Sequence, residues 1–125
     1  MQEEVIALHE KAIAADGGEP GILNPSALES ALFAPRRYWY YTSAPTIIGA
    51  AAVYIHRLCF CHAFFDGNKR TALASGMTFL DLNGLKLPHY PHAETLMIDL
   101  ALKEIGQEEL EHILSDFASA VEPEE

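Results

Sequence analysis

The sequence predicts an all-α protein that folds as one compact bundle of about six helices. Apolar residues recur at helical spacing in successive segments, whereas no stretch alternates apolar and polar residues as a strand does. The chain has 125 residues, 50% of them hydrophobic, which is enough to build one core without disulfides or a structural metal. No repeat or linker divides the chain, so we expect residues 1–125 to form a single domain.

The first two helices are predicted from their apolar residues and their end signals. Residues 3–15 carry an apolar stripe at helical spacing. The glycine- and proline-containing residues 16–21 end that helix. Asn24 and Pro25 are typical of an N-cap followed by a first helical position. They predict a second, short helix, which Pro35 ends.

Residues 36–41, Arg-Arg-Tyr-Trp-Tyr-Tyr, are predicted to be irregular. We expect a loop whose rings pack on the core. The alternative is a flap that faces a substrate. The sequence leaves open which of Arg36, Arg37 and Arg57 faces a functional site.

Residues 47–61 are predicted to form the central helix of the bundle. Nearly every residue in this segment is apolar or small, and a helix that is apolar on most sides is buried. We expect Thr42 or Ser43 to cap its amino-terminal end, with Pro45 early in the helix.

Three further helices complete the prediction. One begins near residue 68 and ends at the Asn-Gly pair of residues 83–84, which is a typical helix C-terminus. Residues 93–105 form the next helix, and residues 107–121 form a last amphipathic one. The acidic tail, residues 122–125, is expected to fray.

The composition excludes several classes of function. A formal net charge of −10 repels phosphate backbones, so direct nucleic-acid binding is not expected, whereas a basic protein partner suits such a surface. The amino terminus is acidic where a secretory signal needs basic residues. No apolar run reaches the ~20 residues needed to cross a bilayer. We therefore expect a cytoplasmic protein with no membrane partner.

Two cysteines, Cys59 and Cys61, lie two positions apart on the predicted central helix. Their side chains then point in different directions, and a disulfide between them would be strained. No third cysteine is available to complete a zinc site with them. We interpret both as small buried apolar residues.

The densest group of polar side chains lies in residues 62–71, His-Ala-Phe-Phe-Asp-Gly-Asn-Lys-Arg-Thr, between two apolar helices. The segment leads into the amino terminus of a helix, where unpaired N–H groups and the helix dipole attract anions. Gly67 permits a tight turn and a close approach of a phosphate. Lys69 and Arg70 add positive charge. Asp66 is a suitable ligand for Mg²⁺, which prefers a carboxylate with phosphate oxygens and water.

His62 stands at the end of the preceding helix and can reach over this loop. A neutral imidazole there can take a proton from an attacking hydroxyl. A base, a metal ligand and a phosphate cradle are the groups that phosphoryl or nucleotidyl transfer needs. Phe64 is expected to turn inward and anchor the loop.

Each of these residues taken alone has a simpler interpretation. His62 could be a histidine stabilised by the helix dipole, and Asp66 or Asn68 could be an N-cap. Lys69 and Arg70 could belong to a solvated face. The combination in this order favours the catalytic interpretation.

The segment from His62 to Thr71 resembles the signature of the Fic/Doc superfamily, His-x-Phe-x-Asp/Glu-Gly-Asn-Gly/Lys-Arg. Lysine after the asparagine, followed by Arg-Thr, is similar to the Doc (death-on-curing) branch. Residues 6–9, 17–21, 27–32 and 79–84 also resemble Doc-type segments. The resemblance covers nearly the whole chain and implies a helical bundle of the Fic/Doc type.

The resemblance implies a role for each motif residue. His62 is the base, and Asp66 holds Mg²⁺ and orients the target hydroxyl. Gly67, Asn68 and Thr71 belong to the phosphate cradle. Lys69 and Arg70 bind the phosphates of ATP or another nucleoside triphosphate, and both count among the catalytic residues.

The Doc branch implies a protein kinase that transfers the γ-phosphate to a hydroxyl of a translation factor like EF-Tu and so stops protein synthesis. A cognate Phd-type antitoxin blocks such a toxin, and we see no internal inhibitory helix. The first alternative is a Fic-type AMP transferase. Lys69 favours the kinase, because a lysine fills space that a glycine leaves open for a diphosphate. The second alternative is a non-catalytic binding module, against which the complete motif argues.

Overall fold

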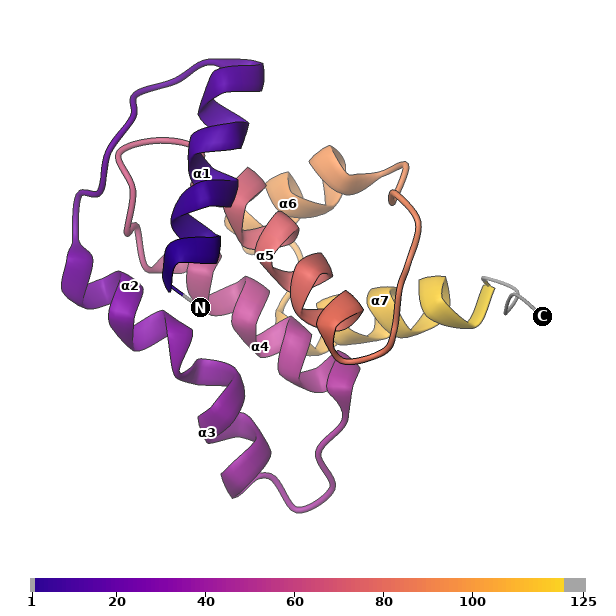
Figure 1. The fold of residues 1–125 in the computed structure, drawn as a ribbon. Helices are drawn as coiled ribbons and strands as arrows, with labels where there is room; N and C mark the ends of the chain where they lie inside the picture. Colours follow the sequence, from indigo (N-terminus) through magenta and orange to yellow (C-terminus); the bar gives the residue numbers. More distant parts are fainter. Residues whose placement is uncertain (1, 121–125) are drawn as a thin grey trace.

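The computed structural model describes residues 2–120 and folds them into seven α-helices and no named strand (Figure 1). In chain order the helices are α1 (Gln2–Asp16), α2 (Pro25–Leu32), α3 (Ala34–Tyr41), α4 (Ile47–Phe60), α5 (Asn68–Leu82), α6 (Ala93–Ala101) and α7 (Gln107–Ala120). The all-α prediction is confirmed. The acidic tail, and Val121 at the predicted end of the last helix, lie outside the described residues.

The additional helix is α3, so the prediction that residues 36–41 are irregular was wrong. Pro35 stands in the first turn of α3, where its missing N–H costs nothing; it begins a helix instead of ending one. Only Tyr38 of the aromatic run turns toward α4, where its hydroxyl accepts a hydrogen bond from the N–H of Thr46 (3.3 Å). Trp39, Tyr40 and Tyr41 are exposed.

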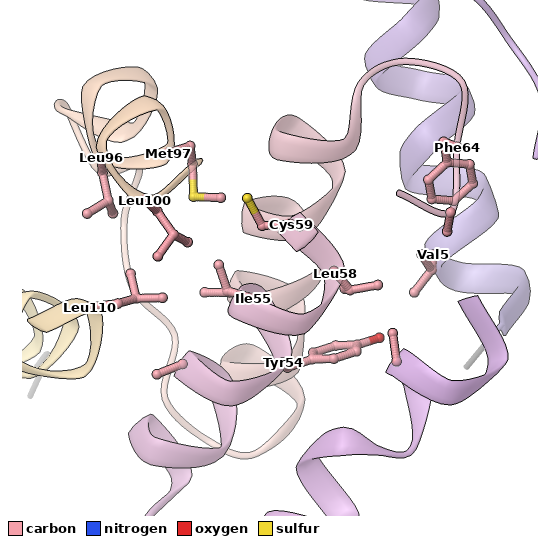
Figure 2. Packing of buried hydrophobic residues seen from close by; sticks show 14 of the residues in the cluster. Val5, Tyr54, Ile55, Leu58, Cys59, Phe64, Leu96, Met97, Leu100 and Leu110 are labelled. Atoms are coloured by element: carbon pink, nitrogen blue, oxygen red, sulfur yellow. The ribbon is translucent and has the colours of Figure 1, made fainter. Parts of the chain in front are cut away.

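Helix α4 is the centre of the bundle, as the sequence predicted. Side chains of the other helices pack on both sides of it (Figure 2). On one side Leu58 of α4 faces Val5 of α1 and Phe64; on the other, Ile55 lies near Leu100 of α6. A Cβ on Gly76 of α5 would collide with the side chain of Ile55. The close contact between α4 and α5 therefore depends on that glycine, and these two helices carry the loop between them.

The helix ends agree with the sequence in part. Asn24 caps α2 as predicted, because its Oδ1 accepts from the N–H of Ala27 (3.1 Å). The cap of α4 is Thr46 rather than Thr42 or Ser43, and its Oγ1 accepts from the N–H of Gly49 (2.9 Å). Pro45 consequently precedes the helix.

The carboxyl-terminal half differs from the prediction at α6. Helix α5 ends at Leu82 with Asn83 as C-cap, as predicted. Helix α6 stops at Ala101, four residues before the predicted end. Lys103 adopts a left-handed conformation (φ 62°), and the N–H of Glu104 bonds to the carbonyl of Asp99 (2.9 Å). This closing turn lets Ile105 pack against the core.

The connection from α1 to α2 runs beside the connection from α4 to α5. Ile22 and Phe64 form an isolated antiparallel bridge. The carbonyl of Ala63 accepts hydrogen bonds from the N–H groups of Leu23 (2.8 Å) and Asn24 (3.0 Å). The two connections therefore hold each other in place. No helix within residues 2–120 is both long enough and apolar enough to span a bilayer.

Candidate active site

The predicted site lies on the loop between α4 and α5. His62 is the second residue after α4 and takes a left-handed backbone conformation (φ 51°). Non-glycine residues rarely adopt this conformation, and where they do the strain is often associated with function. Its side chain is exposed, so the imidazole is accessible to a hydroxyl of another molecule.

Asp66 lies on the same loop, and backbone N–H groups hold its carboxylate. Oδ1 accepts from the N–H of Gly67 (2.8 Å), and Oδ2 accepts from the N–H of Glu19 (3.4 Å). These hydrogen bonds, with smaller contributions from the charges of Arg70 and Lys69, lower the pKa of Asp66 below its ordinary value. The carboxylate is exposed and remains ionised at neutral pH, as a metal ligand must.

Phe64 anchors the loop, as the sequence predicted. Its side chain is 2% exposed and stacks on the ring of His9 from α1, with the centroids 3.8 Å apart and the planes at 10°. Nε2 of His9 lies 2.7 Å from the carbonyl oxygen of Asp66. A carbonyl can only accept, so Nε2 carries the hydrogen. The buried His9 thus holds both the anchor and the backbone of the carboxylate residue.

Asn68 closes the loop on itself. Its Oδ1 accepts from the N–H of Phe64 (3.1 Å), and its Nδ2 donates to the carbonyl of Phe64 (3.0 Å). One N–H of the Asn68 amide remains for a ligand. Gly67 takes a left-handed conformation (φ 74°), and no side chain caps the helix that follows it. The first N–H groups of α5 are therefore available to an anion. The sequence predicted that Gly67 permits such a close approach.

Arg70 joins the site to the end of α1. Its guanidinium donates to the carbonyls of Ala12 (3.0 Å) and Gly17 (3.1 Å) and pairs with Asp16 (3.2 Å). Ala12 lies in the carboxyl-terminal part of α1, and Gly17 directly follows that helix. Arg70 therefore ties the carboxyl-terminal end of α1 to the start of α5. It also lines the groove beside the loop, so it can face a ligand there as well.

The groove beside the loop has a volume of about 840 Å³ and lies between α5, the following connection and α6. Its charged end is formed by Lys69, Arg70 and Asp16, and Glu94 also lines the groove. The apolar lining includes Leu73, Met77, Tyr90 and Met97. The exposed Lys69 stands where the groove meets the loop. Thr71, which we predicted in the phosphate cradle, is 1% exposed, and its hydroxyl has no partner within residues 2–120. Its side chain therefore faces the interior, whereas His62, Asp66 and Lys69 are exposed.

The protein groups at the loop are compatible with a Mg²⁺ ion that takes most of its ligands from a nucleotide and water. Within residues 2–120, no three His, Cys, Asp or Glu side chains are grouped so that they could hold a metal together. Asp66 is one carboxylate with lone pairs to spare beyond its two N–H partners. Mg²⁺ is commonly held by one or two carboxylates plus substrate phosphates and water. The site therefore suits a metal that arrives with a nucleotide.

Sequence reasoning missed the contribution of α1. The sequence singled out residues 6–9 as resembling Doc-type proteins but assigned no role to His9. Ala12, Gly17 and Glu19 contribute only main-chain atoms to the site, and no side-chain pattern reports such contacts. Arg36 and Arg37 belong to α3, and Arg57 lies on an exposed position in the last turn of α4.

Comparison with known proteins found a matching family model and similar named proteins. A model of the Fic/DOC family matches residues 2–80. The chain is 34% identical over 104 residues to the protein named protein kinase doc of Escherichia phage P1. The aligned residues cover 83% of this chain and 82% of that relative. This chain is also 34% identical over 110 residues to the protein named toxin Doc of Mycolicibacterium smegmatis, with 85% of each chain covered. The chain belongs to the Fic/DOC family.

Proposed function

We propose that this protein is a Doc-type toxin that transfers the γ-phosphate of a nucleoside triphosphate to a serine or threonine hydroxyl of an EF-Tu-like translation factor. The observation that carries this proposal is the arrangement of the motif. His62 and Asp66 are both exposed on one short loop, and that loop leads directly into a helix start with free N–H groups. Relatives named as a protein kinase and as a toxin support the same assignment.

The chemistry assigned to the chain begins at the target hydroxyl. His62 accepts the proton from that hydroxyl, whose oxygen attacks the γ-phosphorus. The bond from phosphorus to the β–γ bridging oxygen breaks, and the nucleoside diphosphate leaves. Lys69, Arg70 and the first N–H groups of α5 offset the negative charge on the phosphates.

Asp66, Gly67 and Asn68 position the reacting groups. Asp66 is the residue that would hold Mg²⁺, which would neutralise part of the negative charge of the phosphates. The carboxylate of Asp66 also orients the target hydroxyl. Thr71 remains in the proposed cradle only as part of the helix start, because its side chain is buried and its N–H donates to the carbonyl of Gly67 (3.0 Å).

The groove beside the loop is the proposed nucleotide site. Its charged end, where Lys69 and Arg70 supply the positive charge, lies next to the motif, and its apolar part offers Leu73, Met77 and Tyr90 to a base. Lys69 adds bulk and charge at the mouth of this groove. This placement favours a nucleotide pose that presents the γ-phosphate to the loop, as a kinase needs, over the pose of an AMP transferase, which presents the α-phosphate.

The proposed partners follow from the same function. The target is a translation factor, which places the protein in the cytoplasm. A Phd-type antitoxin blocks the site by laying an amphipathic or disordered segment near it, which folds on binding. No role is proposed for nucleic acid or a membrane as a partner.

A labelling assay tests the proposal. Purified protein is incubated with bacterial EF-Tu, Mg²⁺ and ATP labelled at either the α or the γ position. We expect label on EF-Tu from the γ position only, and none with His62→Ala. Label from the α position would instead establish an AMP transferase and overturn the role given to Lys69. Absence of label from both positions in EF-Tu and in a cell lysate would contradict the transferase assignment.

A further inference from the structure

The solvent-facing side of α3 carries aromatic and basic side chains. Phe33, Arg36, Arg37 and Tyr40 are spaced as i, i+3, i+4 and i+7, which places them on one face of a helix. Phe33 is 44% exposed and Tyr40 is 80% exposed. Trp39 (48%) and Tyr41 (80%) flank this stripe. We call these six residues the α3 face.

The side chains of the α3 face are held by local contacts. The guanidinium carbon of Arg36 lies 5.8 Å from the centre of the Phe33 ring, within the range of a cation–π interaction. Arg37 donates to the carbonyl of Ser30 (3.1 Å). Tyr40 and Tyr41 meet edge to face, 5.1 Å apart. The face is therefore partly ordered before any partner binds, which reduces the entropy cost of binding.

The charge of this region is opposite to that of the rest of the chain. The protein has 18 acidic and 8 basic residues. Residues 30–65 contain three arginines, Arg36, Arg37 and Arg57, and no Asp or Glu. All 18 acidic residues therefore lie before or after this segment. A basic, aromatic face on an acidic protein is a specific feature, since a solvated surface needs neither property.

We propose that the α3 face is a docking surface for an acidic, partly apolar segment of a partner protein. Trp, Tyr and Arg are the residues that dominate binding energy at protein interfaces. Arg36 and Arg37 can each pair with a carboxylate in a bidentate manner. The exposed rings of Trp39, Tyr40 and Tyr41 offer apolar area to side chains between those carboxylates. The partner chemistry follows from this complementarity of charge and shape.

The charge balance favours a protein over two other anionic partners. A nucleic acid or an anionic membrane presents a large negative surface, and it would meet the net charge of −10 around the small basic face. A short acidic segment can contact the α3 face alone. The proposed partner is therefore a short protein segment, and the experiment below also measures binding to DNA and to anionic vesicles.

The α3 face lies away from the catalytic loop (Figure 1). The carboxyl-terminal end of α3 meets the amino-terminal end of α4 through Tyr38 and Thr46, whereas the loop follows the other end of α4. Helix α4 has 14 residues, so the two ends are about 21 Å apart. A partner bound on α3 leaves the loop open. The inference is independent of the proposed function.

Trp39 makes the proposal directly testable, because it is the only tryptophan in the chain and lies in the α3 face. The probe is a synthetic peptide in which Glu and Asp alternate with Leu and Phe. We expect a saturable change in Trp39 emission that weakens as salt is raised. The change should be lost in Arg36→Glu/Arg37→Glu, and the affinity should fall about tenfold or more in Tyr40→Ser/Tyr41→Ser.

A matched variant controls for net charge. Lys11→Glu/Lys86→Glu makes the same change in charge at exposed positions outside the α3 face and should bind like the wild type. We expect each variant to keep its helices, because all four α3 side chains changed are exposed. Circular dichroism checks this expectation. An equal response to a peptide with Lys in place of each acid would overturn the proposal. So would a response confined to phosphatidylglycerol vesicles or to single-stranded DNA, or no response at all.

Discussion

The ring of His9 donates a hydrogen bond from Nε2 to the main-chain carbonyl of Asp66, at 2.7 Å and across 57 residues of sequence. His9 is 3% exposed and also stacks on Phe64. Asp66 is exposed on the other side of the loop. One buried side chain of α1 therefore fixes the backbone from which the proposed metal ligand projects.

Two substitutions separate the roles of His9. His9→Phe keeps a ring against Phe64 but loses the donor, whereas His9→Gln keeps a donor but loses the ring. We expect His9→Phe to lower kcat for the proposed transfer about tenfold or more, because a small misplacement of a reacting group is costly. His9→Gln should recover part of that loss. Steady-state rates and thermal unfolding measure both effects. Equal kcat in wild type and His9→Phe would show that the hydrogen bond has no positioning role.

Replacing His62 should separate activity from stability. His62→Ala and His62→Gly both remove the proposed base and should abolish transfer. Only glycine adopts the backbone conformation of residue 62 without strain. We expect His62→Gly to be more stable than His62→Ala by about 1 kcal/mol, measured by urea unfolding. An unfolded His62→Ala protein would indicate that the residue is structural.

The lowered pKa of Asp66 makes stability depend on pH with a defined sign. A carboxylate whose pKa is lower in the folded state stabilises the protein above its unfolded pKa, and this contribution is lost as pH falls through the folded value. Asp66→Asn lacks the charge. The stability difference between wild type and Asp66→Asn should be constant near neutral pH and shrink below the ordinary pKa of 3.8. Unfolding measured from neutral to acidic pH tests this, and a difference unchanged by pH would contradict the N–H contacts.

The same substitution at Asp66 tests its proposed role as a metal ligand. If Asp66 holds Mg²⁺ with the nucleotide, the Mg²⁺ concentration that gives half-maximal rate should rise in Asp66→Asn and kcat should fall. His62→Ala, which removes the base, serves as the inactive control. An unchanged Mg²⁺ response in Asp66→Asn would exclude the carboxylate as a ligand.

Arg70 should matter to the fold as well as to the phosphates. Its two hydrogen bonds to the carbonyls of Ala12 and Gly17 need the fork of a guanidinium, which lysine does not have. We expect Arg70→Lys to lower stability by about 1–2 kcal/mol and to reduce transfer. Asp16→Asn removes only the half-exposed ion pair and should change stability by less than about 1 kcal/mol. Similar losses in the two variants would mean that the charge pair, and not the carbonyl contacts, holds α1.

The sequence predicted the fold class, the central helix and the position of the loop that carries the motif, because each depends on a local signal. Apolar spacing identified α4, and the order of polar residues from His62 to Thr71 identified the loop. Helix α3 was missed because Pro35 was interpreted as a helix end, although proline is equally suited to a first turn. The early end of α6 was missed because no glycine marks the turn at Lys103.

The supporting contacts of the site could not be predicted for a different reason. Those between the loop and residues 9–24 join positions that are 39 to 58 apart, and most use the main chain. The bond between Arg70 and the carbonyl of Gly17 is one example, and that between the Glu19 N–H and Asp66 is another. A motif reports which side chains are present, and only the fold reports which backbone atoms they meet.

This dependence on the main chain has a consequence for divergence within the family. The hydrogen bonds that tie the loop to residues 9–24 in the described structure each have a backbone atom on at least one side. A carbonyl or an N–H is available there from almost any residue type. Substitutions at positions such as Ala12 or Leu23 can therefore accumulate without dismantling the loop. Relatives that share 34% of their aligned residues with this chain can therefore keep these backbone contacts although most of their side chains differ.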